Sequence, residues 1–210
     1  AELTGARLHL AHISTAGSVR MVREAKARGL KVTAEACPHH FTLTEELTRG
    51  YNTHAKMNPP LRTMQDVQAI KEGLRDGTID VIATDHAPHA TQEKQQEFTE
   101  APFGIVGLET ALSLTLALVD VGVLTLESAV DKLATAPAKA FSLNAGTLAV
   151  GAPADVAIVD PNREWQVDPS RFRSKSRNTP FAGWKVKGRV TTTIVSGRVV
   201  FELDRSERQA

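Results

Sequence analysis

Residues 8–40 read LHLAHISTAGSVRMVREAKARGLKVTAEACPHH and carry the pattern that decides the fold. Residues 8–13 are an apolar run of strand length, and residues 31–36 are a second segment of strand length, rich in β-branched residues at its start. Between them, residues 18–28 have apolar side chains at helical spacing and end before Gly29, a residue typical of helix termini. A strand, a helix and a second strand in succession predict a parallel βαβ unit.

The same alternation continues downstream. Residues 44–47 begin a short helical piece, residues 64–74 place apolar side chains on one helical face, and residues 80–83 form another short apolar strand. Active sites of α/β proteins lie at the C-terminal ends of their strands. We therefore expect the chemistry in the polar loops that follow the three strands, at residues 14–15, 38–40 and 84–86.

The second half of the chain has a different pattern of predicted elements, with helices followed by short β-rich segments. Residues 107–120 and 126–134 predict two helices, and a third opens at Pro137. Short β-rich segments separated by glycine and proline turns then predict an antiparallel sheet, at residues 156–159, 184–186, 190–195 and 198–202. The change in pattern predicts a domain boundary near residue 143, with a β-rich part at 144–203 and a polar tail at 204–210.

Composition is that of an ordinary globular protein of 210 residues. A formal net charge of +1 and an aromatic content of 5% predict no nucleic-acid or membrane partner. Cys37 is the single cysteine, which excludes an intrachain disulfide and favours a reducing, cytoplasmic compartment.

The most apolar run, residues 108–124, contains Glu109 and Asp120 and is too polar to span a bilayer. The chain opens without methionine at what reads as the end of a helix, so we expect a fragment.

Two strand-end residues are candidates for metal chemistry. His12 ends an apolar strand, where a neutral imidazole coordinates zinc well, although a lone histidine is more often a core residue bonded to a carbonyl. Asp85 shares one loop with His86 and His89, and Pro88 stiffens that loop. Metal binding and proton transfer therefore explain Asp85 better than loop capping alone.

Other polar residues are less informative. His39 and His40 are adjacent and point in different directions, so a structural role is favoured over a shared metal. Asn58 precedes a Pro-Pro step on a rigid segment that suits substrate recognition, and a plain turn role is equally supported. His9 and Cys37 are predicted to be structural. Phosphate-binding glycine loops and a Gly-x-Ser-x-Gly motif are absent, so neither nucleotide-dependent chemistry nor a serine nucleophile is indicated.

Five motifs, taken in order, resemble the bacterial long-chain dihydroorotases of the amidohydrolase superfamily. They are HISTAGS (12–18), EACPHHFTLT (35–44), MNPPLR (57–62), TDHAPH (84–89) and PFGIVGLET (102–110). Two later segments fit the same group, NTPFAGW (178–184) and TIVSGRVV (193–200). One such motif is weak, but five in register are specific.

The resemblance implies a fold and a reaction. Such enzymes are (β/α)₈ barrels of the TIM type with a small β-sandwich, so residues 1–143 would hold barrel strands 6 to 8 with their helices, and residues 144–203 part of the antiparallel sandwich. They interconvert N-carbamoyl-L-aspartate and L-dihydroorotate in pyrimidine biosynthesis, using one or two zinc ions. By resemblance, His12 binds the more buried zinc, and Asp85 binds the other zinc and serves as general base. The implied substrate-binding positions are Asn58, His89, Phe103 and Gly104.

The sequence also departs from that pattern. The His-x-His pair, bridging carboxylate and further histidine of the earlier barrel strands have no counterpart in these 210 residues. Two expected ligands remain, whereas a catalytic zinc needs at least three. Three parallel strands also leave an open edge. We therefore expect the isolated chain to be unstable and inactive.

Three alternatives stay open at this point. Allantoinases and dihydropyrimidinases share the barrel and the metal aspartate, although His89 and residues 57–62 suit a carboxylate-bearing substrate better. A non-catalytic homologue could instead act as a scaffold for aspartate transcarbamoylase, but such proteins tend to lose metal ligands, and His12 and Asp85 are present. A plain structural βα domain would make every strand-end polar residue a coincidence. For assembly we expect a homodimer, with aspartate transcarbamoylase as a further candidate partner.

Overall fold

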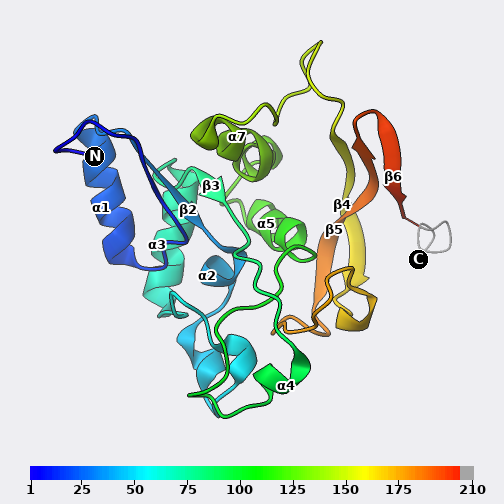
Figure 1. Ribbon diagram of the computed structural model, residues 1–210. Helices are drawn as coiled ribbons and strands as arrows, with labels where there is room; N and C mark the ends of the chain where they lie inside the picture. The colour runs from blue at the N-terminus through cyan, green and yellow to red at the C-terminus, as the bar shows by residue number, and fades with distance from the viewer. Residues whose placement is uncertain (204–210) are drawn as a thin grey trace.

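The computed structural model describes residues 1–203 and has the α/β architecture that the sequence predicts. The tail predicted at residues 204–210 lies outside the described residues. Figure 1 shows a parallel sheet from the first part of the chain and an antiparallel sheet from the last part, with helices from the middle of the chain between them. Within residues 1–203, no helix combines the length and apolar character that crossing a membrane requires.

The parallel sheet has the order β1-β2-β3, with Leu8 beside Val32 and Ala36 beside Ile82. Helices α1 and α3 pack against each other outside this sheet (Figure 1). The elements of this part are β1 (Leu8–Leu10), α1 (Ala16–Ala27), β2 (Val32–Ala36), α2 (Pro38–Thr42), η1 (Glu45–Thr48), η2 (Thr53–Ala55), α3 (Met64–Arg75), β3 (Val81–Ile82) and α4 (Thr91–Lys94).

Two of the predicted strands end earlier than the sequence suggests. β1 stops at Leu10 rather than near residue 13, and β3 stops at Ile82. Shortly after each end, a non-glycine residue takes a positive φ, which is 36° at His12 and 49° at Asp85. Extended strands require negative φ, so the backbone must leave the sheet where these two side chains emerge.

Helices α1 and α3 are each capped by a threonine at their N-termini. The Thr15 side chain accepts a hydrogen bond from the Ser18 amide, which starts α1 two residues before the predicted position. Thr63 and Asp66 form a reciprocal capping box at the start of α3. Asp66 also accepts a hydrogen bond from the Ala16 amide at 2.8 Å, which ties the two helix starts together.

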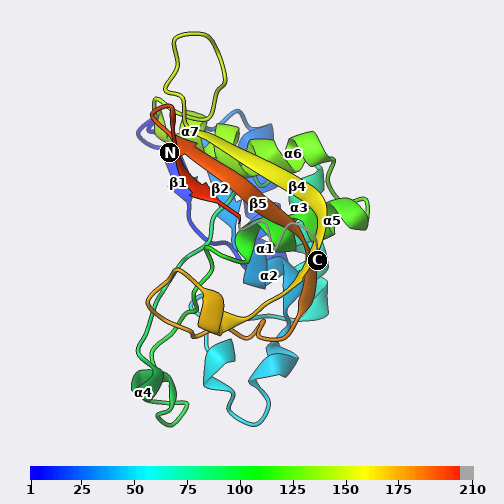
Figure 2. The same ribbon diagram turned by 90° about the vertical axis from the view of Figure 1, so that its right-hand side faces the viewer.

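The middle of the chain forms the layer between the sheets (Figure 1), and in the turned view of Figure 2 the strands β4 and β5 lie in front of these helices. The elements are α5 (Ala111–Asp120), α6 (Leu126–Val130), η3 (Asp131–Thr135) and α7 (Ala136–Phe141). Of these, η3 is a single π-helical turn. α5 begins four residues later than predicted, because residues 105–107 run alongside the loop after β3 instead of coiling. α5 is buried on several faces, as expected for a helix packed from two sides.

The antiparallel sheet has the order β4-β5-β6 and is longer than the sequence predicts. β4 (Val156–Gln166) continues past residue 159, and β5 (Lys185–Val195) is one strand where two segments were predicted; η4 (Pro169–Arg171) lies between them. A β-carbon added at Gly188 would lie 2.1 Å from Leu116 Cδ1, so glycine lets α5 pack closely on β5. β6 (Arg198–Glu202) matches its prediction, and the turn before it has positive φ at Ser196 and Gly197.

Candidate active site at the strand ends

The polar loops predicted to carry chemistry follow β1, β2 and β3, and they lie at one edge of the parallel sheet. His12, residues 37–40 and Asp85 come after these three strands in turn. The carboxyl ends of parallel strands lie at the same end of the sheet, so even short strands place residues that are distant in sequence near one another. His12 is half-buried, whereas Asp85 is exposed to solvent.

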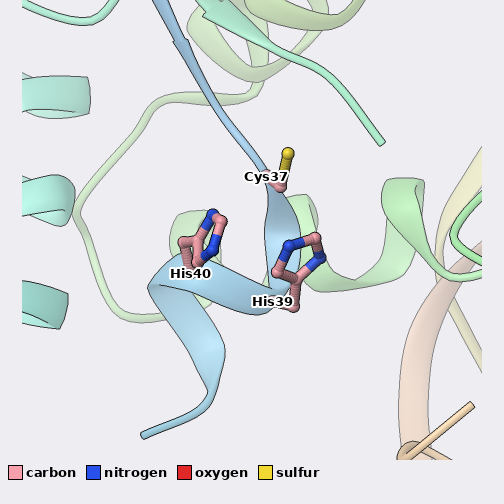
Figure 3. A group of neighbouring side chains, drawn as sticks. All are labelled: Cys37, His39 and His40. Carbon is pink, nitrogen blue, oxygen red and sulfur yellow. The ribbon is translucent and has the colours of Figure 1, made fainter. Parts of the chain in front are cut away.

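A buried cluster of Cys37, His39 and His40 stands where β2 passes into α2 (Figure 3). Their potential ligand atoms all lie within 4.8 Å of one another, and the two imidazole centroids are 4.2 Å apart. Sequence reasoning gave the histidine pair a structural role and did not predict the cluster. His40 Nε2 lies 2.9 Å from the Pro59 carbonyl oxygen, a hydrogen bond that gives this nitrogen a structural role.

The electrostatics of this cluster favour neutral imidazoles. Burial lowers the pKa of His39 well below its ordinary value, and the neighbouring His40 and His12 lower it further. Burial also lowers the pKa of His40, and the bond to Pro59 opposes this only in part. Burial raises the pKa of the Cys37 thiol, with smaller contributions from the charges of Asp85 and Glu35. Cys37 is therefore a neutral, buried thiol, as the sequence predicts.

His12 and Asp85 both act on one imidazole. The charge of His12 lowers the pKa of His40, and the charge of Asp85 raises it. His12 and Asp85 follow β1 and β3, the two strands that flank β2, so both lie at the same end of the parallel sheet as His40. Their roles as metal ligands and general base stay predictions.

The donor atoms at this edge fit a metal cation. His12 Nδ1 is buried and has no hydrogen-bond partner among the described residues. An unsatisfied buried nitrogen is costly, and coordination of a cation removes that cost. Neutral imidazole nitrogen and a carboxylate such as that of Asp85 form a typical zinc donor set. His9 does not belong to it, because its two nitrogens bond to Thr33 and Glu35 at 2.8 and 3.0 Å.

The predicted substrate-binding residues come together from three separate segments. The His89 Nε2 lies 2.8 Å from the Phe103 carbonyl oxygen. The Gly104 amide donates to the Lys56 carbonyl at 2.8 Å, which joins the same loop to the segment that leads to Asn58. Asn58 is exposed, and the Phe103 ring is 52% exposed, so both are available to a small molecule.

The loop after β3 and the loop around Gly104 are held in very close contact. The Ala87 amide donates to the Ile105 carbonyl at 2.8 Å, and His86 Nδ1 accepts from the Gly107 amide at 3.1 Å. A β-carbon at Gly104 would lie 2.5 Å from the Ala87 β-carbon, and the φ of Gly104 is +96°. Only glycine fits at this position, because another residue would have an unfavourable backbone angle and a β-carbon too close to Ala87.

Two residues that sequence reasoning did not select complete this region. The buried Lys94 Nζ donates to the carbonyls of Pro102 and Gly104 at 2.9 and 3.2 Å. Burial lowers the pKa of Lys94 to about 8, and the nearby Lys56 adds to the effect. Asn178 is also buried and contacts both loops. Lys94 has no sequence signal, whereas Asn178 opens one of the quoted motifs.

Comparison with known proteins shows the family to which the chain is similar. The amidohydrolase family model matches residues 3–200. The chain is 61% identical over 203 residues to a dihydroorotase from Syntrophotalea carbinolica and 59% identical over 202 residues to one from Citrifermentans bemidjiense. These alignments cover 97% and 96% of the chain but 48% of each relative. The chain thus spans about half the length of the curated relatives it matches.

Solved structures extend the likeness to the fold. A dihydropyrimidinase from Brevibacillus agri superposes with a TM-score of 0.90 at 26% identity, and an L-hydantoinase from Arthrobacter aurescens with 0.90 at 33%. Each match covers 96% of this chain and 46% of the other. The fold-class prediction, a C-terminal portion of a TIM-like barrel followed by antiparallel strands, is confirmed. This family implies a metal cofactor, and the chain belongs to the amidohydrolase family.

Proposed function

We propose that this chain forms the C-terminal half of a zinc-dependent dihydroorotase, which interconverts N-carbamoyl-L-aspartate and L-dihydroorotate in de novo pyrimidine (UMP) synthesis. The observation that carries the proposal is an identity of 55–61% to curated dihydroorotases over nearly the whole chain. The hydantoinases superpose well but are less similar in sequence, at 26–33% identity. A cytoplasmic location is part of the proposal and agrees with the single free thiol of Cys37.

The proposed metal site uses His12 and Asp85, with the remaining ligands supplied from outside this chain. The unpartnered Nδ1 atom of His12 supports its role as a ligand. When bound, zinc would lower the pKa of water and polarise the amide carbonyl of the substrate. His39 and His40 would stay neutral behind these ligands, because protonating either one would place a buried cation beside the metal.

Asp85 is proposed to move the proton. Its exposed carboxylate can accept a proton from the attacking water and deliver it to the ring nitrogen as the amide bond breaks. Protonation matters because an amide nitrogen is a poor leaving group as an anion. In the reverse direction, Asp85 removes the proton from the carbamoyl nitrogen while the ring closes.

Substrate orientation falls to the three joined segments. Asn58 and His89 would hold the exocyclic carboxylate, and the backbone at Phe103 and Gly104 would face the ring. The contact of His89 Nε2 with the Phe103 carbonyl supports this proposal, since it keeps the imidazole beside the loop that faces the ring. The carboxylate distinguishes dihydroorotate from hydantoin and dihydrouracil, which lack it.

The test uses a chimera in which this chain replaces the matching 48% of the Syntrophotalea carbinolica dihydroorotase. We expect the chimera to hydrolyse dihydroorotate and to leave allantoin, hydantoin and dihydrouracil essentially untouched. Asp85→Asn should lower kcat by at least roughly 100-fold, because the amide cannot take up the proton. Asp120→Asn, at an exposed carboxylate at the end of α5, is the matched control and should keep full activity.

Metal content gives a second measurement that does not depend on turnover. Zinc per chimera, measured by atomic emission, should fall in His12→Asn but not in His9→Asn, since His9 already has two partners. Preferred turnover of allantoin or a hydantoin would move the assignment to those cyclic amidohydrolases. A folded chimera without metal or turnover, which binds aspartate transcarbamoylase, would favour the scaffold.

A further inference from the structure

We propose that Asn178 is a positioning residue of this site, whose side-chain amide holds the Asp85–His89 loop against the Phe103–Gly104 loop. The inference rests on the proposed function for its kinetic consequences. Asn178 comes from the segment that leads into β5, and the partners of its side-chain amide lie between 74 and 91 residues earlier in the chain. It therefore connects the C-terminal part of the chain to residues at the strand ends.

Its contacts reach both loops at once. The Asn178 Nδ2 donates to the Ala87 carbonyl at 2.9 Å and to the Gly104 carbonyl at 3.2 Å. The Oδ1 accepts from the His89 amide at 3.2 Å. The backbone carbonyl of Asn178 accepts from the Val106 amide at 3.0 Å. A single residue thus satisfies polar groups on both sides of the contact between the loops.

Because Asn178 is buried, its hydrogen bonds must be made by a side chain of the right chemistry. Asn178 is 3% exposed, so water has little access to replace any of these bonds. Both Nδ2 hydrogens and an Oδ1 lone pair are used, and only a carboxamide offers two donors and an acceptor in this geometry. A chemically different side chain leaves at least one backbone group of a substrate-facing loop unsatisfied.

Lys94 shows which loop depends more on Asn178. The Gly104 carbonyl receives both the Asn178 amide and the Lys94 ammonium, the latter at 3.2 Å. Loss of Asn178 would leave Gly104 held by Lys94. In contrast, the Ala87 carbonyl and the His89 amide would each lose the partner that Asn178 provides. The expected displacement is therefore on the side of His89 rather than on the side of Gly104.

The experiment is carried out on the chimera with Asn178→Ala and measures steady-state kinetics with dihydroorotate. We expect kcat/KM to fall roughly 10- to 100-fold, mostly through a higher KM, because the binding loop is no longer oriented. Thr179→Ala is the matched control, since Thr179 is buried next to Asn178 and its hydroxyl oxygen accepts a local hydrogen bond from the Phe181 amide. The control should lose stability without a change in KM.

Asn178→Asp separates the donor function from the shape of the side chain. The carboxylate keeps the acceptor for the His89 amide but turns a negative oxygen toward two carbonyls. Protonation restores one donor, so the ratio of kcat/KM between this variant and the unmodified chimera should rise as the pH falls. A merely structural role would lower thermal stability without this recovery in the ratio.

Hydrogen exchange provides a readout that does not need dihydroorotase activity. In Asn178→Ala, the amide of His89 should exchange at least about tenfold faster, while the Gly104 amide, bonded to Lys56, should change less. Unchanged exchange at His89, or equal KM values for Asn178→Ala and Thr179→Ala, would overturn the inference. An inactive chimera that still shows the exchange pattern would reject the proposed function and keep Asn178 as the link between the loops.

Discussion

Gly104 shows how a single residue limits the site. Its φ of +96° lies outside the range that other residues adopt easily, and an added β-carbon would overlap that of Ala87 at 2.5 Å. We predict that Gly104→Ala lowers the free energy of unfolding of the chimera by roughly 2–4 kcal/mol, the sum of the backbone and overlap terms. The substrate KM should rise as well, because relief of the overlap moves the loop. Urea denaturation and initial-rate kinetics measure the two effects.

Gly29→Ala is the control for that prediction. Gly29 also has a positive φ, of +76°, but no atom lies within 4 Å of its added β-carbon. This variant should lose only the backbone part, about 1–2 kcal/mol, and should keep the KM of the unmodified protein. Equal losses in the two variants would mean that the contact between Gly104 and Ala87 does not limit the site.

At the scale of elements, the starts of α1 and α3 are held by one carboxylate. Burial raises the pKa of Asp66, but hydrogen bonds from the Thr63 hydroxyl and from the amides of Ala16 and Thr63 outweigh it, so the pKa lies below its ordinary value. In the unfolded chain the pKa of this carboxyl group is near 3.8. Its lower pKa in the folded protein stabilises the fold at pH values above 3.8, and this stabilisation is lost as the pH falls through the folded pKa. α1 follows the loop of His12, so this link also supports the site.

We predict that Asp66→Ala lowers the free energy of unfolding of the chimera by about 1–3 kcal/mol at pH 7, through the lost cap and the unsatisfied Ala16 amide. The difference from the unmodified protein should shrink below about pH 4, where the carboxylate is protonated. Urea titrations at several pH values measure both effects. Gln65→Ala, at an exposed position on the same helix, is the control and should stay within about 0.5 kcal/mol. A pH-independent loss in Asp66→Ala would argue against the charged cap.

For the whole molecule, the described residues hold three parallel strands, and β1 and β3 are the two edges of this sheet. Leu8 in the edge strand β1 is 42% exposed, whereas β3 is buried, and three strands are too few to close a barrel. We predict that the 210-residue chain alone unfolds without a cooperative transition and shows no dihydroorotate turnover. Circular dichroism on heating and a turnover assay test this. Cooperative unfolding together with turnover by the chain alone would contradict the prediction.

Much of the fold could be predicted because its signals are local. Apolar runs and glycine stops act within a few residues, so the βαβ alternation and the three strand-end loops follow directly from residues 8–86. The predicted ends of β1 and β3 lie too late in the chain, because the positive φ of His12 and of Asp85 is incompatible with an extended strand and the apolar runs carry no sign of it. The domain boundary near residue 143 stays a prediction.

The sequence by itself determined the α/β class, the likeness to amidohydrolases and the choice of His12, Asp85, Asn58 and His89 as candidates, since each depends on short-range pattern or on quoted motifs. Only the tertiary structure decided that Asn178 and Lys94 hold the loops of this site and that β5 runs unbroken through Gly188. The side-chain hydrogen bonds of Asn178 join residues that are 74 to 91 positions apart, and neither these bonds nor the packing of Leu116 on Gly188 leaves a periodic trace in the chain. They arise only when distant segments exclude water from the same volume.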